Sequence, residues 1–282
     1  MNVIESVDSK LEDLSISLVV YKPDIDKLNA TLASLGAACD EIHKIDRSFS
    51  IALYLVDNDG SLPDLSAALS ALTLRNVVVT VITGHGNVGY GGGHNLAIER
   101  SNSLYHLVLN PDIELAPDAL RQALHFFGCH SEVGLIAPWI GDEHGDQQFL
   151  CRRYPTIFDL FVRGFLPPQL HRIFESRLAR YEMRDETNGR EIVWDPLIVS
   201  GCFMLFRTSA LKQLAGFDTR YFLYFEDYDL SLRTHAVTRV AYVPDVRVVH
   251  HGGGASRKGS SHIRMFISSA YKFFNRFGWK WL

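Results

Sequence analysis

Three carboxylates lie within four positions of the segment YFEDYDL, residues 224–230. They are Glu226, Asp227 and Asp229, and aromatic side chains stand on both sides of them. A carboxylate costs free energy wherever apolar neighbours exclude water, unless another group pairs with it or a reaction uses it. The segment is therefore compatible with the start of a helix, with a metal site or with a catalytic base in a pocket.

Asp229 has a structural explanation within this segment. Arg233 follows it at the i,i+4 spacing that forms ion pairs on a helix, and acids in the first turn of a helix interact favourably with its dipole. The dipole argument also applies to Glu226, whose role stays open. Neither argument explains why Asp227 lies beside so many aromatic residues, so its role stays open on these grounds alone.

Polar residues also follow two apolar runs, as Asp57-Asn58 after IALYLV and as Asn110-Pro111-Asp112 after YHLVL. Asp and Asn often bond their own backbone in turns, which is the ordinary explanation for both sites. Asp112 is also suited to hold Mg²⁺ or Mn²⁺ against a diphosphate, because such metals often take one or two carboxylates and complete their shell with phosphate oxygens and water.

Two histidines, His250 and His251, follow a late apolar run and precede three glycines. A histidine at such a place is more often structural than bound to metal. Imidazole is nevertheless an acceptable extra ligand for Mn²⁺, and we predict that role for His250. Which of the two histidines is functional stays open.

The segment GYGGGHNLA, residues 89–97, resembles a dinucleotide-binding fingerprint. The spacing fails, because His94 or Leu96 stands where the third glycine is needed. Glycine could serve only the turns of the loop. We favour a loop whose small residues let a substrate lie close to the backbone, with a helix N-terminus facing its phosphates.

The candidate residues lie in a pattern that occurs four times along the sequence: an apolar strand, a polar segment at its end and an amphipathic helix. The expected strands are residues 14–21, 51–56, 76–82 and 105–110. Such a pattern predicts a parallel sheet with crossover helices, whose ligands lie beyond the carboxyl ends of the strands. The first helix is expected to begin after Pro23-Asp24 and to end at Gly36.

The second half is less regular. Residues 141–195 are expected to be an irregular insertion, in which Arg152 and Arg153 are either surface charge or a phosphate contact. A strand is expected at 197–206, followed after the acidic segment by two short strands, RVAYV and VRVVH. The tail is aromatic and basic, which indicates core packing or dimer contact and also suits an anionic membrane surface.

Composition excludes several classes of protein. The chain has 282 residues, 47% of them hydrophobic, and a formal net charge of -4, which argues against a nucleic-acid binder. Its four cysteines show no CxxC spacing, so neither a zinc site nor a disulfide framework is expected. A reduced, cytoplasmic setting is predicted, since no signal peptide and no membrane-spanning apolar run are visible.

Taken in order, LVVYKPD, VDNDG, GNVGYGGGHNLAI, LNPDIEL, SGCFMLFR, GFDTRYFLYFEDYDLSLR and VVHHGGGAS resemble the family 2 inverting glycosyltransferases of the GT-A fold, and among them the rhamnosyltransferase-like branch. The resemblance implies a nucleotide-diphosphate sugar as co-substrate, with Mg²⁺ or Mn²⁺. It implies that Asp227 is the catalytic base and that Asp112 and His250 form the metal and diphosphate site. The other residues expected near donor or acceptor are Tyr21, Asp57, Asn58, Asn87, Gly89, Gly91, Asn95, Asn110, Arg152 and Glu226.

Two positions depart from the family pattern. Asn110 replaces the first acid of the Asp-x-Asp motif, as in the rhamnosyltransferase-like branch, which makes metal dependence less secure. The first strand ends in Tyr21-Lys22-Pro23, where relatives commonly have Tyr-Asn.

The expected architecture is a single α/β domain of the GT-A type, with a Rossmann-like, mostly parallel sheet. Residues 14–115 form its nucleotide-sugar half, 116–256 its acceptor-side half and 257–282 a basic, aromatic tail. The expected activity transfers a sugar, plausibly L-rhamnose from dTDP-rhamnose, to a cell-surface glycan or lipid-linked acceptor at the inner face of the membrane. A nucleotidyltransferase and a non-catalytic sugar-nucleotide-binding protein are the alternatives, and a homodimer is compatible with the tail.

Overall fold

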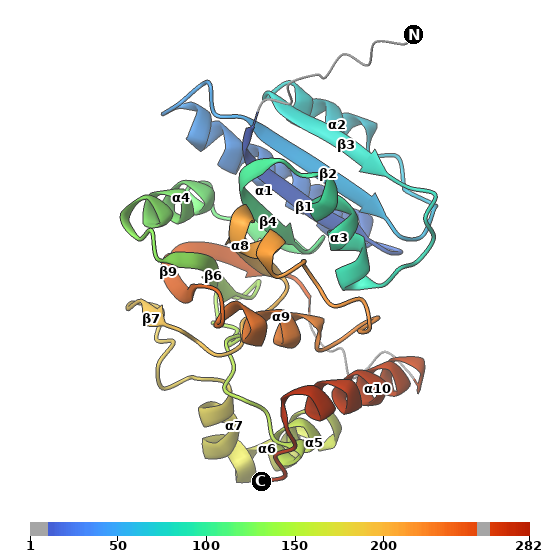
Figure 1. Ribbon diagram of the computed structural model, residues 1–282, viewed down its shortest axis with the longest axis vertical. Helices are drawn as coiled ribbons and strands as arrows, with labels where there is room; N and C mark the ends of the chain where they lie inside the picture. The colour runs from blue at the N-terminus through green and yellow to red at the C-terminus, as the bar shows by residue number, and fades with distance from the viewer. Residues whose placement is uncertain (1–10, 253–259) are drawn as a thin grey trace.

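The computed structural model describes residues 11–252 and 260–282, and the sheet runs through the middle of the molecule (Figure 1). In this described part the sheet has nine strands in the order β3-β2-β1-β4-β8-β6-β9-β5, and β7 pairs with β9. The strands are β1 (Glu12–Val20), β2 (Ile51–Asp57), β3 (Val77–Ile82), β4 (Ser103–Leu109), β5 (Ile113–Leu115), β6 (Val133–Gly141), β7 (Val193–Trp194), β8 (Phe203–Arg207) and β9 (Arg239–His250).

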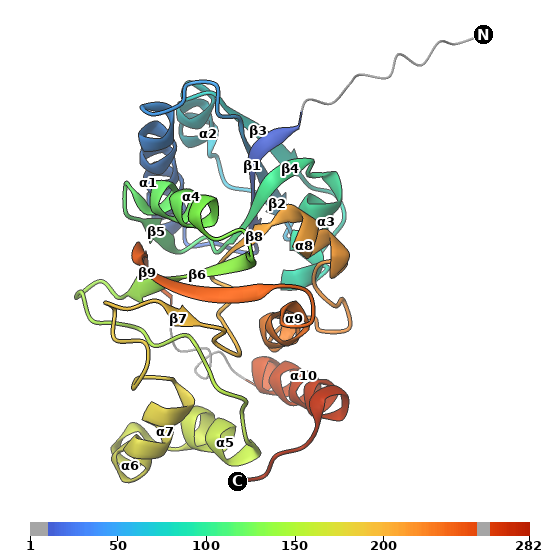
Figure 2. The same cartoon turned by 60° about the vertical axis from the view of Figure 1, so that its left-hand side comes forward.

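Helices cover both faces of the sheet (Figure 2). On one face lie α1 (Ile25–His43), α2 (Ser66–Thr73) and α4 (Ala119–Cys129). On the other lie α3 (Tyr90–Arg100) and α8 (Thr208–Gln213), with α9 (Glu226–Thr234) beside α3. This three-layer arrangement is the expected α/β class.

The four N-terminal strands confirm the predicted parallel sheet. Strand β1 pairs in parallel with β2 and β4, and β2 pairs in parallel with β3. Strand β2 is buried along its whole length, which its continuous apolar run requires, because a parallel strand between helices meets no water on either face. The carboxyl ends of β1, β2 and β4 therefore lie at one edge of the sheet.

The acceptor-side half of the sheet is mixed rather than parallel. Strand β8 is antiparallel to β4 and to β6, and β5 is antiparallel to β9. The predicted strand 197–206 is wrong in its first part, because β8 begins only at Phe203. The two predicted short strands form one strand, β9, whose pairing with β6 shifts register near Pro138, so Pro244 and Asp245 are accommodated at an irregularity.

The predicted irregular insertion contains helices. They are α5 (Ile157–Phe165), α6 (Pro168–His171), a 3-10 turn η1 (Arg172–Phe174) and α7 (Glu175–Tyr181). The expectation was wrong because it overlooked a capping box: the Thr156 side chain accepts from the Asp159 backbone, and Asp159 accepts from the Thr156 backbone. These helices lie below the sheet beside α10 (Ser260–Phe277) (Figure 1).

The first helix also extends beyond its predicted end. Helix α1 continues through Gly36 to His43. A Cβ at Gly36 would lie 3.3 Å from Arg75 Cδ and 3.4 Å from Leu72 Cδ2, so the glycine admits the neighbouring segment rather than ending the helix.

A chain of buried hydrogen bonds joins β1, β4 and α3. Ser15 Oγ lies 2.7 Å from His106 Nδ1, His106 Nε2 lies 2.9 Å from Ser17 Oγ, and Ser17 Oγ lies 2.7 Å from His94 Nδ1. Burial lowers the pKa of both histidines, that of His106 to about 3, so both rings are neutral at pH 7. We call Ser15, Ser17, His94 and His106 the serine–histidine cluster.

Candidate active site

The carboxyl ends of the strands collect the predicted chemistry. Asp112 follows β4, the segment before β8 carries Gly201 and Cys202, and α9 begins with Glu226 and Asp227. The charges of Asp112 and Asp227 both act on the Cys202 thiol, whose pKa burial raises to about 12. Asp112, Glu226 and Asp227 all act electrostatically on Tyr90 as well, and we call these three residues the acid cluster.

Asp112 faces His250 at the predicted metal position. Asp112 Oδ1 lies 3.5 Å from His250 Nε2, which is long for a hydrogen bond, and has no other partner among the described residues. Burial alone would raise the pKa of Asp112, but His250 and Lys27 outweigh it and lower the pKa, so the carboxylate is ionised. A Cβ at Gly252 would lie 2.4 Å from both Asp112 Oδ2 and His250 Nε2, so both atoms face one small space that glycine leaves open.

These two side chains fit a divalent cation that needs other ligands as well. No group of three or more His, Cys, Asp or Glu side chains able to hold a metal occurs in residues 11–252 and 260–282. One carboxylate and one imidazole suffice only where phosphate oxygens and water complete the shell, which is a common arrangement for Mg²⁺.

The structure separates the two histidines. His250 is held by Gln148, with 3.2 Å between His250 Nδ1 and Gln148 Oε1, and its ring is turned to Asp112. His251 Nε2 lies 2.7 Å from Glu114 Oε1 on β5, so His251 serves a different carboxylate. This geometry favours His250 over His251 at the metal position.

Asp227 is half-buried and held from two sides. Its Oδ2 accepts a hydrogen bond from the Gly201 backbone at 3.0 Å, and its Oδ1 accepts one from the Tyr228 backbone at 3.0 Å. Burial raises the pKa of Asp227, although these bonds and Arg152 oppose it. A carboxylate whose pKa is raised is a stronger base than an ordinary aspartate, which suits removal of a proton from a hydroxyl.

Glu226 is more deeply buried than its neighbour. Its exposed fraction is 5%, and its Oε2 has no hydrogen-bond partner in the described chain. Burial and the adjacent Asp227 raise the pKa of Glu226 well above its usual range. Burial therefore disfavours the charged form of both members of the pair.

Asp229 is structural, as predicted. It is fully buried and lies 2.5 Å from Arg233 and 2.6 Å from Arg276 of α10.

The backbone is strained just before the acids. Tyr224 and Phe225 have φ values of 71° and 67°, a left-handed conformation that costs about 1–2 kcal/mol for each residue with a Cβ. Helix α10 holds this turn in place: Ser269 Oγ donates to the Leu223 carbonyl at 2.8 Å, and Phe273 packs against Phe225. Strain supported in this way is typical of a segment that aims functional side chains.

The glycine loop packs against protein. A Cβ at Gly89 would lie 2.3 Å from the Phe222 carbonyl oxygen, and one at Gly91 would lie 2.7 Å from Phe217 Cβ. Both amide atoms of Asn95 bond the Phe217 backbone, at 2.8 and 2.9 Å. Close packing against residues 217–222 explains these three residues; contact with a donor stays a prediction for them and for exposed Asn87, which accepts from the Gly89 backbone.

The other residues expected to contact the donor differ in whether their side chains are already hydrogen-bonded within the protein. Asp57 accepts from the backbones of Asp59, Gly60 and Leu62, which is the turn role considered for it. Buried Asn58 bridges His85 and the Gly89 carbonyl.

Tyr21, by contrast, is 51% exposed. Asn110 Oδ1 is buried without a hydrogen-bond partner among the described residues. Both side chains have capacity left for a ligand.

The two adjacent arginines differ. Arg153 forms a surface ion pair with Asp185 at 2.8 Å. Arg152 is 3% exposed, bonds the Cys151 carbonyl at 3.0 Å and lies over the Tyr181 ring. Its charge acts on Asp227, which places Arg152 on the side of the base; a phosphate contact stays a prediction.

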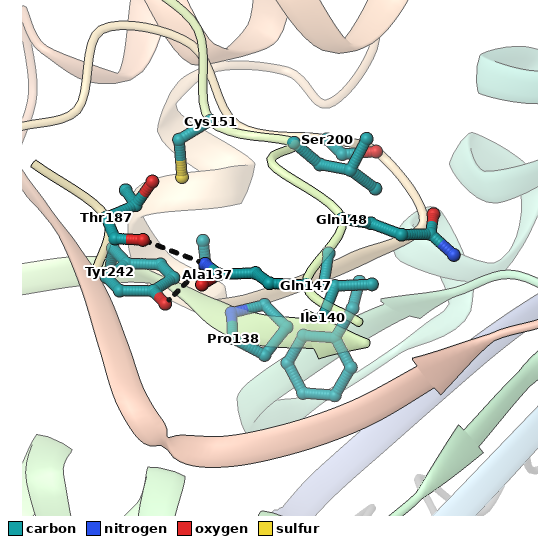
Figure 3. A pocket seen from close by; sticks show the side chains of 11 residues that line it. Ala137, Pro138, Ile140, Gln147, Gln148, Cys151, Thr187, Ser200 and Tyr242 are labelled. Carbon is teal, nitrogen blue, oxygen red and sulfur yellow. Dashed lines mark hydrogen bonds between the residues drawn. The ribbon is translucent and has the colours of Figure 1, made fainter. Parts of the chain in front are cut away.

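A small cavity adjoins the site (Figure 3). It is lined by residues that include Gln147, Gln148, Ser200 and Tyr242, and Gln147 bonds Tyr242 and the Thr187 carbonyl. Its volume of about 10 Å³ is the space for one water molecule, too small for a sugar ring.

Several residues at the site were missed by the sequence analysis. They are Lys27, Tyr90, Gln148, Gly201 and Cys202. Lys27 Nζ donates to the His251 carbonyl at 2.7 Å across 224 positions of sequence, and its charge acts on Asp112. No local pattern indicates a contact of this range. Gly201 and Cys202 lie in the segment SGCFMLFR, which contributed to the family resemblance, but neither residue was assigned to the site.

Comparisons with known proteins identify the family of the chain. The family model described as glycosyl transferase family 2 matches residues 31–215. The chain is 28% identical over 273 residues to the N-acetylglucosaminyl-diphospho-decaprenol L-rhamnosyltransferase of Mycobacterium tuberculosis (strain H37Rv), covering 92% of this chain and 83% of that protein. It is 26% identical over 201 residues to rhamnosyltransferase WbbL of Escherichia coli (strain K12), covering 68% and 72% respectively.

Among solved structures, the chain is similar to that of GalNAc-T7 with UDP, GalNAc and Mn²⁺. The TM-score is 0.61 at 15% identity, and the match covers 95% of this chain and 48% of that chain, so the chain spans about half its length. This is a likeness of fold, and it confirms the expected GT-A type of α/β architecture.

Proposed function

Because the chain belongs to glycosyl transferase family 2, we propose that it is an inverting enzyme that moves a sugar from a nucleotide-diphosphate donor to a hydroxyl of a glycan or lipid-linked acceptor. The proposed donor is dTDP-L-rhamnose. Support for the sugar and for the acceptor class comes from the two rhamnosyltransferase relatives, one of which is named for a diphospho-decaprenol acceptor.

The observation that carries the proposal is the state of Asp227. It is a half-buried carboxylate with a raised pKa, held in one orientation by two backbone N–H groups. In the proposed step, the acceptor oxygen bonds to the anomeric carbon while the bond from that carbon to the diphosphate oxygen breaks. The electron pair leaves with the diphosphate, and the acceptor proton moves to Asp227. One base suffices because the leaving diphosphate needs no proton, whereas a glycosidase needs two carboxyl groups.

The opposite side of the site receives the diphosphate. Asp112 and His250 would hold Mg²⁺ or Mn²⁺, which neutralises the negative charge that develops on the leaving group. Lys27 adds a fixed positive charge near Asp112 and is held by the His251 carbonyl. Donor contacts are proposed for the residues predicted from the family resemblance, among which Tyr21 and Asn110 have capacity left for a ligand.

Peripheral contact with the cytoplasmic face of an anionic membrane is part of the proposal. Helix α10 packs Phe273 and Phe274 inward and exposes Ile263, Ile267 and Tyr271 as a stripe on its outer side. The end of the chain adds Trp279 and Trp281, 42% and 66% exposed. Aromatic side chains with nearby Lys and Arg suit the headgroup region of a bilayer. No helix in the described residues is long and apolar enough to cross one.

Vesicle binding tests this contact. The intact protein should co-sediment with anionic vesicles, and Ile267→Glu should reduce the bound fraction severalfold. The stripe could instead be covered by a second copy of the chain, and sedimentation of the protein alone tests this. A dimer that Ile267→Glu dissociates, together with no binding to vesicles, would contradict membrane contact.

An acceptor-dependent transfer assay tests the activity itself. Purified protein is incubated with dTDP-, UDP- or GDP-sugars, Mg²⁺ or Mn²⁺ and a polyprenyl-diphosphate N-acetylglucosamine acceptor. We expect release of nucleoside diphosphate that requires acceptor, and a new linkage whose anomeric configuration is opposite to that of the donor. Donor binding without transfer would indicate a binding protein. Pyrophosphate release from nucleoside triphosphate and sugar 1-phosphate would indicate a nucleotidyltransferase, and a retained configuration would contradict inversion.

A further inference from the structure

Tyr90 joins three segments of the site that are far apart in sequence. It is the first residue of α3, and its backbone N–H donates to the Phe222 carbonyl at 3.1 Å. Its hydroxyl donates to the Gly201 carbonyl at 2.6 Å. The charged groups that act on its phenol are Glu226, Asp227 and Asp112. Tyr90 thus stands between the glycine loop of the donor half and the acids of the acceptor half.

Gly201 is fixed between Tyr90 and the base. A Cβ at Gly201 would lie 3.2 Å from Asp227 Cβ and 3.4 Å from Tyr90 Cε1 and Oη, so both side chains press on this residue. Gly201 accepts from Tyr90 through its carbonyl and donates to Asp227 Oδ2 through its N–H. The position of this N–H, and with it the orientation of the carboxylate, therefore depends on the Tyr90 hydroxyl.

The glycine loop as a whole is interlocked with the turn that precedes the base. Gly89 and Gly91 admit Phe222 and Phe217 at distances that a Cβ would not allow, and Asn95 bonds the Phe217 backbone. Any ordering of the loop by a donor is thereby transmitted to residues 217–225, which lead directly into Glu226 and Asp227.

We propose that Tyr90 is a positioning residue that ties the orientation of Asp227, through the Gly201 backbone, to the donor-side glycine loop. The proposal rests on the proposed function, in which Asp227 is the base. Tyr90 is not itself proposed to contact the reacting atoms; it acts by fixing Gly201 through its carbonyl, and the N–H of the same residue orients the carboxylate. A misplacement of a catalytic group by about 1 Å can cost about a hundredfold in rate.

The test compares Tyr90→Phe with a matched control, Tyr54→Phe. Tyr54 on β2 is buried, and its hydroxyl also donates to a backbone carbonyl, that of Arg100 at 3.5 Å, at the opposite end of α3 from Tyr90. Both variants lose only a hydroxyl. For Tyr90→Phe we expect kcat to fall about tenfold with donor KM changed less than about twofold. For Tyr54→Phe we expect both constants to stay within about twofold of the parent.

A pH profile separates positioning from general loosening of the fold. The Gly201 N–H bond lowers the pKa of Asp227, so weakening it should move the acid limb of kcat/KM to higher pH by about half a unit. The ionisable groups facing Asp227 are those of Glu226, Arg152, Tyr90 and Cys202. Tyr90→Phe removes only the phenol hydroxyl and leaves the other three groups unchanged. Tyr54→Phe should leave the limb unmoved.

Gly201→Ala is a second variant, which disturbs Asp227 by steric contact rather than by loss of the Tyr90 hydroxyl. The added methyl would push against Asp227 and Tyr90, and we expect a similar loss of kcat with donor binding retained. Equal kinetics and equal pH profiles for Tyr90→Phe, Tyr54→Phe and parent would overturn the role of Tyr90 while leaving the function intact. Full activity of Asp227→Asn would instead remove the base assignment, and the positioning role with it.

Discussion

The serine–histidine cluster and the acid cluster are both groups of buried or partly buried polar side chains, but they differ in how fully their atoms are paired. In the first, Ser15, Ser17 and both ring nitrogens of His106 have partners within 2.9 Å. Only His94 Nε2 lacks one in the described chain. In the second, Asp112 Oδ1 and Glu226 Oε2 lack hydrogen bonds among the described residues, as does neighbouring Asn110 Oδ1.

This difference assigns the clusters to different tasks. Buried polar atoms are nearly always paired in folded proteins, and an unpaired one needs a reason. A cluster whose described polar side-chain atoms are paired, apart from His94 Nε2, stabilises the fold and offers a ligand little hydrogen-bonding capacity. The unpaired oxygens lie where several strands end. They can coordinate a cation or accept a hydrogen bond from a substrate hydroxyl. Substitutions in the two clusters should therefore have opposite consequences.

The sharpest test of this division is Asp227→Asn. The amide keeps the shape of the side chain but cannot take a proton, so transfer should fall about a thousandfold while donor binding, measured by titration calorimetry, is retained. Asp195→Asn, which removes an exposed carboxylate paired with Arg239, is the control and should not change transfer. Retention of a tenth or more of parental activity would show that Asp227 is not the base.

Asp112→Asn should give the next largest effect. Loss of the charge at the metal position should reduce transfer about a hundredfold and raise the Mn²⁺ concentration needed for half-maximal rate. Glu114→Gln, on the adjoining strand and facing His251, is the matched control. Equal Mn²⁺ responses of the two variants would break the link between Asp112 and the metal.

Ser17→Ala tests the other cluster. It removes the hydroxyl shared by His94 and His106 and leaves ring nitrogens buried without partners, so the free energy of unfolding should fall by about 1–3 kcal/mol. Transfer by the folded variant at 25 °C should equal that of the parent. Ser70→Ala, at an exposed helix position, should change neither quantity. A loss of activity without a loss of stability would mean that the cluster is not purely structural.

The same cluster predicts how stability depends on pH. The folded pKa of His106 is about 3 and that of His94 is lowered as well, whereas both are near 6.5 when unfolded. Between these values the unfolded chain binds more protons, so stability is lost as pH falls below 6.5, by about 1.4 kcal/mol per pH unit for each histidine. Urea unfolding at pH 7.5, 6.5 and 5.5 measures this. A flat response would show that the rings can charge in place.

The sequence predicted the donor half of the fold well because its signals are local. Apolar runs specify β1 to β4, and β1, β2 and β3 are each followed by a helix that must return across the sheet. The acceptor half depends on pairing between distant segments. Strand β9 runs through Pro244 because β6 shifts register beside it, which no local pattern indicates.

The candidate site was predicted in part for a related reason. Asp112, Asp227 and His250 could be named because their residue types are unusual at strand ends and family motifs contain them. Asn95 and Gly91 could be named from the same motifs, but their side chains and Cβ directions turn to Phe217, which only the folded loop reveals. Lys27 lies outside the quoted motifs, and Tyr90 lies inside the glycine motif without being assigned a role; both bond partners more than a hundred positions away.

Helix α10 makes the chemistry depend on residues that never approach a substrate. Ser269 and Phe273 support the left-handed turn at Tyr224 and Phe225, and that turn aims the acids. In a selection for altered acceptor use, we expect changes in this last helix as well as at the strand ends. A mutagenesis library confined to the strand ends would miss the α10 positions that support this turn.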